Sequence, residues 1–124
     1  MLTKSAILDA KDLAVKNIPV PEWGGEVGVR ILTGAERDDF DSACANARRV
    51  GGRVDTRGLK IKLVSLGICD EKGERLFDEK DIKDLQRKSG KALDRVFTAV
   101  QKHNGMSAEE VEDLKGNSDA DLSD

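Results

Sequence analysis

The alternation of apolar and polar residues after a proline- and glycine-rich turn is the feature that most constrains the fold. From Glu26 to Ile31 every second residue is apolar, which is the period of a half-buried strand. Upstream, residues 15–20 form a weaker apolar run, and Pro19 within it cannot donate a ladder hydrogen bond, which indicates an edge strand. The pattern predicts a β-hairpin over about residues 13–32. The face of the second strand expected to sit on the helices consists of Val27, Val29 and Ile31.

A helix-start signal follows the hairpin directly. Thr33 suits the N-cap, and Glu36, three residues on, suits the reciprocal position of a capping box. The helix is predicted to run to about Arg48, after which Gly51 and Gly52 end it. Its apolar face has the spacing i, i+3, i+4, i+7 and consists of Phe40, Ala43, Cys44 and Ala47.

Residues 55–69 fit two structures. Leucines recur there at helical spacing, whereas the alternation of apolar residues with lysines over residues 59–63 fits a strand. The run is longer than an ordinary strand of about five or six residues, which favours a helix. We expect that helix to begin after Asp55 or Thr56 and to end near Gly67, with a strand as the alternative.

Helix caps recur through the second half of the chain. Asp78 and Ser89 are each suited to the N-cap of a helix, and Asn104–Gly105 suits the end of the second one. Ser107 begins another capping box and a last short helix, and a single helical turn is expected within residues 2–12. The apolar stripe of the helix after Ser89 consists of Leu93, Val96, Phe97 and Val100.

These elements predict an α+β fold, in which an N-terminal β-hairpin packs against about four amphipathic helices. A chain of 124 residues is by default one domain, here expected over residues 1–116. Aromatic residues make up only 3% of the chain, so the core must rest on aliphatic side chains. Residues 117–124 are acidic and nearly free of apolar side chains, which predicts a disordered tail.

Composition and residue inventory exclude several functions. The net charge of −3 argues against nucleic-acid binding, which needs a clustered positive field. No apolar run approaches the roughly 18 residues of a membrane span, and no apolar segment typical of a signal peptide follows Met1. Cys44, Cys69 and the single His103 lack the spacing of a zinc site or a Cys-His nucleophile. We therefore expect no catalytic residues, no metal and no cofactor, and place His103 at a helix end where it can contact the last carbonyls.

The tip of the predicted hairpin is the candidate partner-binding site. An exposed tryptophan is typical of binding hot spots, because it buries a large area at a low entropic cost. The alternative is that Trp23 folds back over the helices and fills a core short of aromatic side chains, and both can hold. The candidate residues are Pro21, Glu22, Trp23, Gly24 and Gly25.

The run PEWGG, followed by VxVRxLTGAERDxF, resembles the tail assembly chaperones of long-tailed bacteriophages, from siphophages or prophages, and the similarity extends over about residues 1–115. The resemblance implies a non-enzymatic viral protein of the host bacterial cytoplasm. Such a chaperone binds the tape measure protein and assists tail tube assembly, with the major tail tube protein as a further candidate partner. A homo-oligomer and a longer frameshifted form stay open. The alternative is a small structural virion protein of the tail or the head–tail connector.

Overall fold

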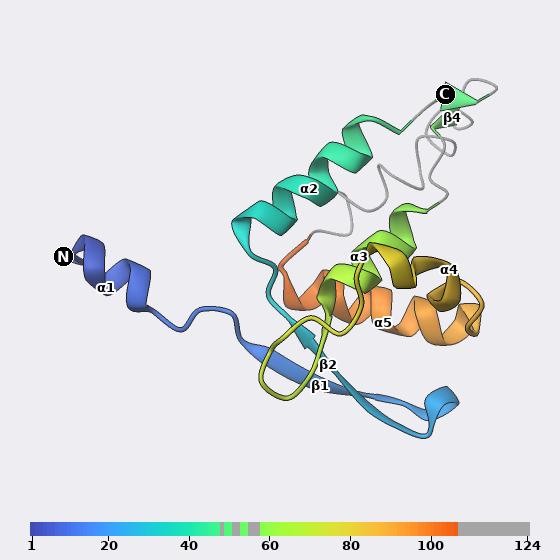
Figure 1. Ribbon diagram of the computed structural model, residues 1–124, viewed down its shortest axis with the longest axis horizontal. Helices are drawn as coiled ribbons and strands as arrows, with labels where there is room; N and C mark the ends of the chain where they lie inside the picture. The colour runs from blue at the N-terminus through green and yellow to red at the C-terminus, as the bar shows by residue number, and fades with distance from the viewer. Residues whose placement is uncertain (48, 51–52, 55–57, 107–124) are drawn as a thin grey trace.

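A small antiparallel sheet with helices packed against it forms the described part of the protein, so the predicted α+β class is confirmed (Figure 1). The structure is a computed structural model. It describes residues 1–47, 49–50, 53–54 and 58–106.

The predicted hairpin is present at the expected position. Strand β1 (Val15–Val20) pairs antiparallel with β2 (Gly25–Arg30), in a register that places Ile18 opposite Val27. One turn of 3-10 helix, η1 (Pro21–Trp23), joins the two strands. The sheet order is β1-β2-β5, so β1 is at an edge, in agreement with Pro19.

The ambiguous segment contains both kinds of structure. Its middle is the predicted helix, α3 (Leu59–Gly67), and the chain then continues as a short strand, β5 (Ile68–Cys69), which pairs antiparallel with β2. The sequence did not predict this third strand. Asp55 and Thr56, the expected caps, lie outside the described residues, and the residue before α3 is Gly58, with φ of 86°.

The capping box predicted for the first long helix, α2 (Gly34–Ala45), is confirmed. Thr33 Oγ1 accepts from the Glu36 backbone N–H at 3.1 Å, and Glu36 Oε1 accepts from the Thr33 backbone N–H at 3.0 Å. The helix ends before the expected Arg48, which lies outside the described residues. Two short strands follow and pair with each other, β3 (Arg49–Val50) and β4 (Arg53–Val54).

The second half of the described chain contains η2 (Glu79–Asp81), α4 (Ile82–Leu85) and α5 (Gly90–His103). Both predicted caps are confirmed: Asp78 accepts from the Lys80 backbone N–H at 3.0 Å, and Ser89 Oγ accepts from the Ala92 backbone N–H at 3.2 Å. The helix expected after Ser107 and the tail at 117–124 fall outside the described residues.

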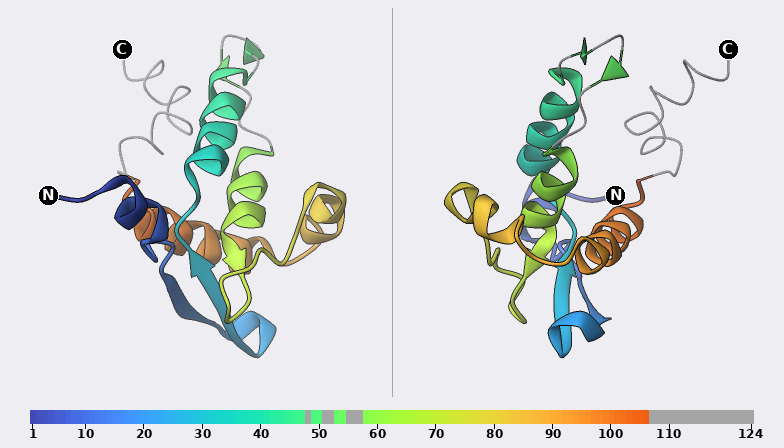
Figure 2. Two further views of the ribbon diagram at one scale, coloured as in Figure 1. Left: turned by 60° about the vertical axis from the view of Figure 1, so that its left-hand side comes forward. Right: turned by 90° about the vertical axis from the view of Figure 1, so that its right-hand side faces the viewer.

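The core lies between the sheet, α3 and α5, with α2 beside α3 (Figure 2). The apolar stripe of α5 is buried as predicted, and so is Phe40 of α2. Val29 of β2 is fully buried, whereas Val27 and Ile31 are half-buried. Arg30, on the face expected to be polar, is only 5% exposed.

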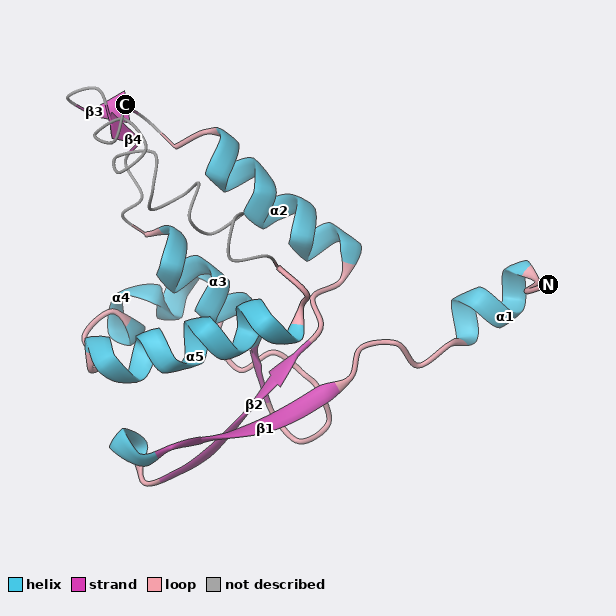
Figure 3. Cartoon of the chain, turned by 180° about the vertical axis from the view of Figure 1, so that it is seen from behind, coloured by secondary structure: helices cyan, strands magenta, loops and turns pink. Residues whose placement is uncertain are grey.

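The first helix, α1 (Lys4–Asp9), lies away from the rest of the molecule (Figures 1 and 3). It is joined to β1 by the extended residues 10–14, and none of its own residues, all of which are described, is buried. Within the described chain, no helix combines the length and apolar character that crossing a membrane requires.

Candidate functional site

The five candidate residues form the turn of the hairpin. Pro21 opens η1, and the Gly24 N–H donates to the Pro21 carbonyl at 3.1 Å. Gly24 has φ of 75°, a left-handed conformation that glycine adopts without strain. Gly25 begins β2, so the two glycines turn the chain back along β1. Pro21, Glu22, Gly24 and Gly25 are exposed, and Trp23 is half-buried.

A pair of hydrogen bonds ties the turn to α5. Arg95 of α5 donates to both carboxylate oxygens of Glu22, with Nε–Oε1 and Nη2–Oε2 distances of 3.2 and 3.1 Å. The hydrogen bond from Arg95 is the main reason that the pKa of Glu22 lies below its ordinary value. The sequence carries no local signal for the role of Arg95, which lies 73 residues from Glu22 in the chain.

An apolar pocket of about 210 Å³ lies beside Trp23. Phe77 and Leu85 form its other apolar walls, while Asp84 and Lys88 contribute charged groups. Trp23 also packs against the core cluster, so the indole is partly a core residue and partly a pocket wall. Its Nε1 is buried, and no acceptor among the described residues lies within hydrogen-bond distance. The pocket thus offers apolar surface with two charged groups beside it.

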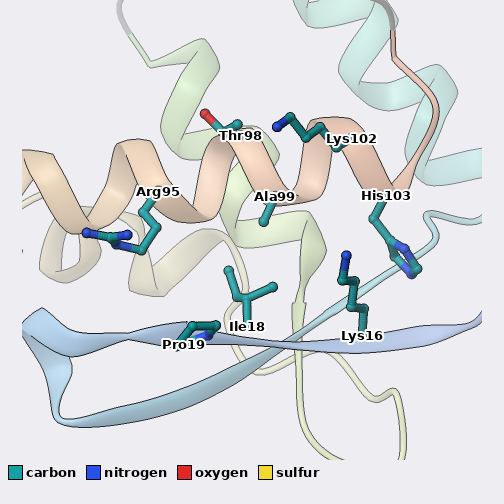
Figure 4. A pocket seen from close by; sticks show the side chains of 8 residues that line it. All are labelled: Lys16, Ile18, Pro19, Arg95, Thr98, Ala99, Lys102 and His103. Carbon is teal, nitrogen blue, oxygen red and sulfur yellow. The ribbon is translucent and has the colours of Figure 1, made fainter.

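A groove of about 430 Å³ lies between β1 and α5 (Figure 4). Ile18 of β1 and Ala99 of α5 point toward each other and form its apolar centre. Lys16 and His103 lie at one end and Arg95 at the other. Pro19, Thr98 and Lys102 complete the lining. The groove is therefore apolar in the middle and basic around it.

The TGAER part of the chain forms a corner between β2 and α2. Arg30 Nη2 donates to Glu36 Oε2 at 2.5 Å and to the Leu66 carbonyl of α3 at 3.1 Å. Burial by itself would raise the pKa of Glu36, but hydrogen bonds from Arg30 and the Thr33 backbone outweigh it, so that pKa is lowered. These residues stabilise the corner and do not line either pocket.

Asn104 connects the same corner to the end of α5. Its Oδ1 accepts from the Leu32 backbone N–H at 2.8 Å, and its Nδ2 donates to the Arg30 and Val100 carbonyls at 3.1 and 2.9 Å. The side chain thus caps α5 and holds the chain between β2 and α2 against it. The sequence pattern predicts only that Asn104 ends the helix, and does not predict its contacts with residues 30 and 32.

Cys44, Cys69 and His103 are the side chains considered for catalysis or metal binding. Cys44 and Cys69 are free thiols, and burial raises the pKa of both. His103 Nε2 lies 2.8 Å from the Ala14 carbonyl, in the segment before β1, and this contact replaces the expected one with the last carbonyls of the helix. Among the described residues, no group of three or more His, Cys, Asp or Glu side chains could hold a metal ion.

The fold is similar to that of a solved structure, the tail assembly chaperone of bacteriophage HK97. The two superpose with a TM-score of 0.59 over 79% of this chain and 94% of that chain, with 17% sequence identity. No protein-family model and no curated protein matches the chain.

Proposed function

We propose that this protein is a tail assembly chaperone of a long-tailed bacteriophage, active in the host bacterial cytoplasm and without enzymatic activity. The observation that carries the proposal is the likeness in fold to the HK97 chaperone, which covers 94% of that chain. The resemblance of the stretch from PEWGG to TGAERD supports it independently, because it rests on residues and not on shape.

The proposed partner is the tape measure protein, with the major tail tube protein as a second partner during assembly. Tape measure proteins in this family are long and helical and expose apolar stripes until the tube encloses them. A chaperone that covers such stripes reversibly keeps the partner soluble. The chemistry needed is therefore apolar contact with a few directional hydrogen bonds, and no covalent step.

We assign the contact to the hairpin tip and the pocket beside Trp23. At about 210 Å³ the pocket is smaller than the roughly 300–1,000 Å³ typical of small-molecule sites, and it suits one apolar side chain. The Trp23 Nε1–H has no acceptor among the described residues. Because that N–H is itself buried, the docked segment contacts the pocket through its apolar surface.

The proposal is tested by co-expressing the protein with the tape measure protein of the same phage and measuring its solubility and capture. We expect the tape measure protein to become more soluble and to be captured with the chaperone. An unchanged solubility and no capture would contradict the proposal. A protein found as a permanent part of purified particles would instead be a structural virion component.

Two substitutions of Trp23 test the site itself. Trp23→Ala removes the pocket wall and should weaken partner binding by about 2 kcal/mol or more, the range of hot-spot residues. It should also lower the melting temperature, because the indole is half-buried against the core. Trp23→Phe keeps an aromatic ring of smaller size, so it should weaken binding and lower the melting temperature less than Trp23→Ala does.

The matched control is Gln86→Ala, an exposed position next to α4 that does not line the pocket. It should leave both stability and affinity unchanged. If binding survives both Trp23 substitutions at full strength, the chaperone role can still hold, but the contact lies elsewhere on the molecule.

A further inference from the structure

The charge of this protein is divided unevenly along the chain. Residues 107–124, which lie outside the described residues, contain seven of the 24 acidic residues and one of the 21 basic residues. Their net charge is −6, so residues 1–106 carry a net charge of +3. Acidic C-terminal segments of this kind often act as interaction tails. The folded part of the chain therefore has the opposite charge to the chain's own C-terminal segment.

The β1–α5 groove is the basic surface to which such a segment is attracted. No Asp or Glu of the described chain is among its lining residues, whereas Lys16, Arg95, Lys102 and His103 are. Arg95 already binds the carboxylate of Glu22. The two lysines are exposed, and neither forms an ion pair with a described residue. The groove thus combines an apolar centre with two cations that have no counter-ion within the described chain.

We propose that the acidic tail, residues 117–124, docks in the β1–α5 groove of its own chain and covers it. Leu122 is the one large apolar side chain of the tail. It occupies the apolar centre of the groove, where Ile18 and Ala99 point toward each other (Figure 4). The low apolar content of the tail prevents it from forming a core of its own, but a charged segment can still dock on a surface of opposite charge.

The order of charges along the tail matches the groove. In an extended segment, Asp119 and Asp121 precede Leu122 by about 10 and 3 Å. Lys102 lies about 4.5 Å further along α5 than the apolar centre, and Lys16 lies at the same end of the groove. Both carboxylates therefore reach the lysines when the leucine is in the centre. Exposed ion pairs are individually weak and are screened by salt, so the docking is reversible.

The connecting segment is long enough for the tail to return to the groove. Met106, the last described residue, follows His103 of the groove lining by three positions. Residues 107–116 span about 15 Å as the helix predicted after Met106 and about 36 Å if fully extended. The groove's wall on α5, from Arg95 to His103, measures about 12 Å at the helical rise per residue. Either form of the connection lets the tail lie along the groove.

A docked tail regulates access to the groove. A competing acidic segment with one apolar side chain has to displace a tethered competitor, whose effective concentration on a short connection is in the millimolar range. Only a partner that binds tightly, or one that first engages the tail, opens the groove. This inference concerns the chain itself and does not depend on binding of a tape measure protein.

Three variants of the full chain test the proposal by exchanging charges. The tail variant carries Asp119→Lys and Asp121→Lys. The groove variant carries Lys16→Glu and Lys102→Glu, both exposed residues of the groove lining. The swapped variant carries all four changes, which restores opposite charges with their positions exchanged. Circular dichroism and thermal melting show that each variant is folded.

The mobility of the Leu122 amide, measured by heteronuclear magnetic relaxation in dilute protein, reports whether the tail is docked. It should be low in the unmodified chain, high in the tail and groove variants, and low again in the swapped variant. In about 1 M salt, where the Debye length is about 3 Å, it should be high in every protein. The control, Lys83→Glu with Lys91→Glu, makes the same change of charge at exposed positions outside the groove and should behave as the unmodified chain.

The amide shifts of Ile18 and Ala99 locate the contact. They should differ between the unmodified chain and the tail variant, while those of α2 should be the same in both. The proposal is overturned if Leu122 is equally mobile in the unmodified chain and the two single-site variants, or if the swapped variant fails to restore its low mobility. It is also overturned if the low mobility disappears on dilution, because the tail would then dock on another copy.

Discussion

The Glu36 carboxylate takes part in a capping box and in an ion pair at once. Its Oε1 accepts from the Thr33 backbone N–H, and its Oε2 accepts from Arg30, whose side chain is 6% exposed. Burial would raise the pKa of Glu36, but these hydrogen bonds hold it below the ordinary value of 4.5. The charged form is therefore part of the folded state.

Glu36→Gln should lower the free energy of unfolding by about 3 kcal/mol near neutral pH, because it leaves Arg30 buried without its counter-ion. Glutamine keeps an acceptor for Thr33, so the capping box survives. Since the folded pKa lies below 4.5, the contribution of Glu36 is complete above pH 4.5 and is lost as the pH falls through the folded value. The difference in the free energy of unfolding between the original protein and Glu36→Gln should therefore become smaller as the pH falls below 4.5.

Urea unfolding over a pH series measures this difference. The control is Glu26→Gln on the neighbouring strand, where the side chain is exposed. A gap between the original protein and Glu36→Gln that stays constant down to strongly acidic pH would show that the carboxylate charge is not the cause.

Gly67, the last residue of α3, packs closely against α5. A Cβ at this position would lie 2.6 Å from both γ-carbons of Val100, which is fully buried. Gly67→Ala should therefore destabilise the protein by about 1–3 kcal/mol through overpacking. Gly90→Ala, where a Cβ meets nothing within 4 Å, should be neutral or stabilising. Equal melting temperatures for the two variants would contradict the packing argument.

At the scale of whole elements, Asn104 couples α5 to the connection between β2 and α2. Asn104→Asp keeps the size of the side chain and the acceptor for Leu32. It removes the donations to Arg30 and Val100 and adds a negative charge at the C-terminal end of the helix, where cations are favoured. We expect a loss of about 1–3 kcal/mol in the free energy of unfolding.

Hydrogen exchange should localise the effect of this substitution. Protection should fall at Leu32 and in the last turn of α5 more than in α3. Asn17→Asp, the same chemical change at an exposed position of β1, is the control. A uniform loss of protection throughout the chain would mean that Asn104 acts on global stability and does not couple these two elements.

For the molecule as a whole, α1 contributes nothing to the core, since none of its residues is buried. Deleting residues 2–12 should therefore leave the melting temperature of the monomer unchanged. The comparison needs dilute protein, because any self-association would add stability to the longer chain alone. A clearly lower melting temperature of the shortened protein at high dilution would show that residues 2–12 pack against the rest of the same chain.

Local signals determined most of the elements. The two-residue alternation predicted the hairpin, and the caps at Thr33, Asp78 and Ser89 predicted three helix starts, because capping bonds join residues two or three apart in the chain. The stripe of α5 was likewise readable, since an amphipathic helix repeats its apolar face regardless of what covers it. The turn at the candidate site was predicted from the local run of proline and glycine residues alone.

Only the tertiary structure determined which of those elements pack against one another. A two-residue strand such as β5 has no periodicity, and it forms because β2 offers free backbone groups. Arg30 is buried because the Leu66 carbonyl, 36 residues away, accepts from it, which strand alternation does not encode. The pocket beside Trp23 and the groove at Ile18 are each lined by residues from segments that are distant in the sequence. Such surfaces exist only once the chain is packed, because their shape depends on which elements lie side by side.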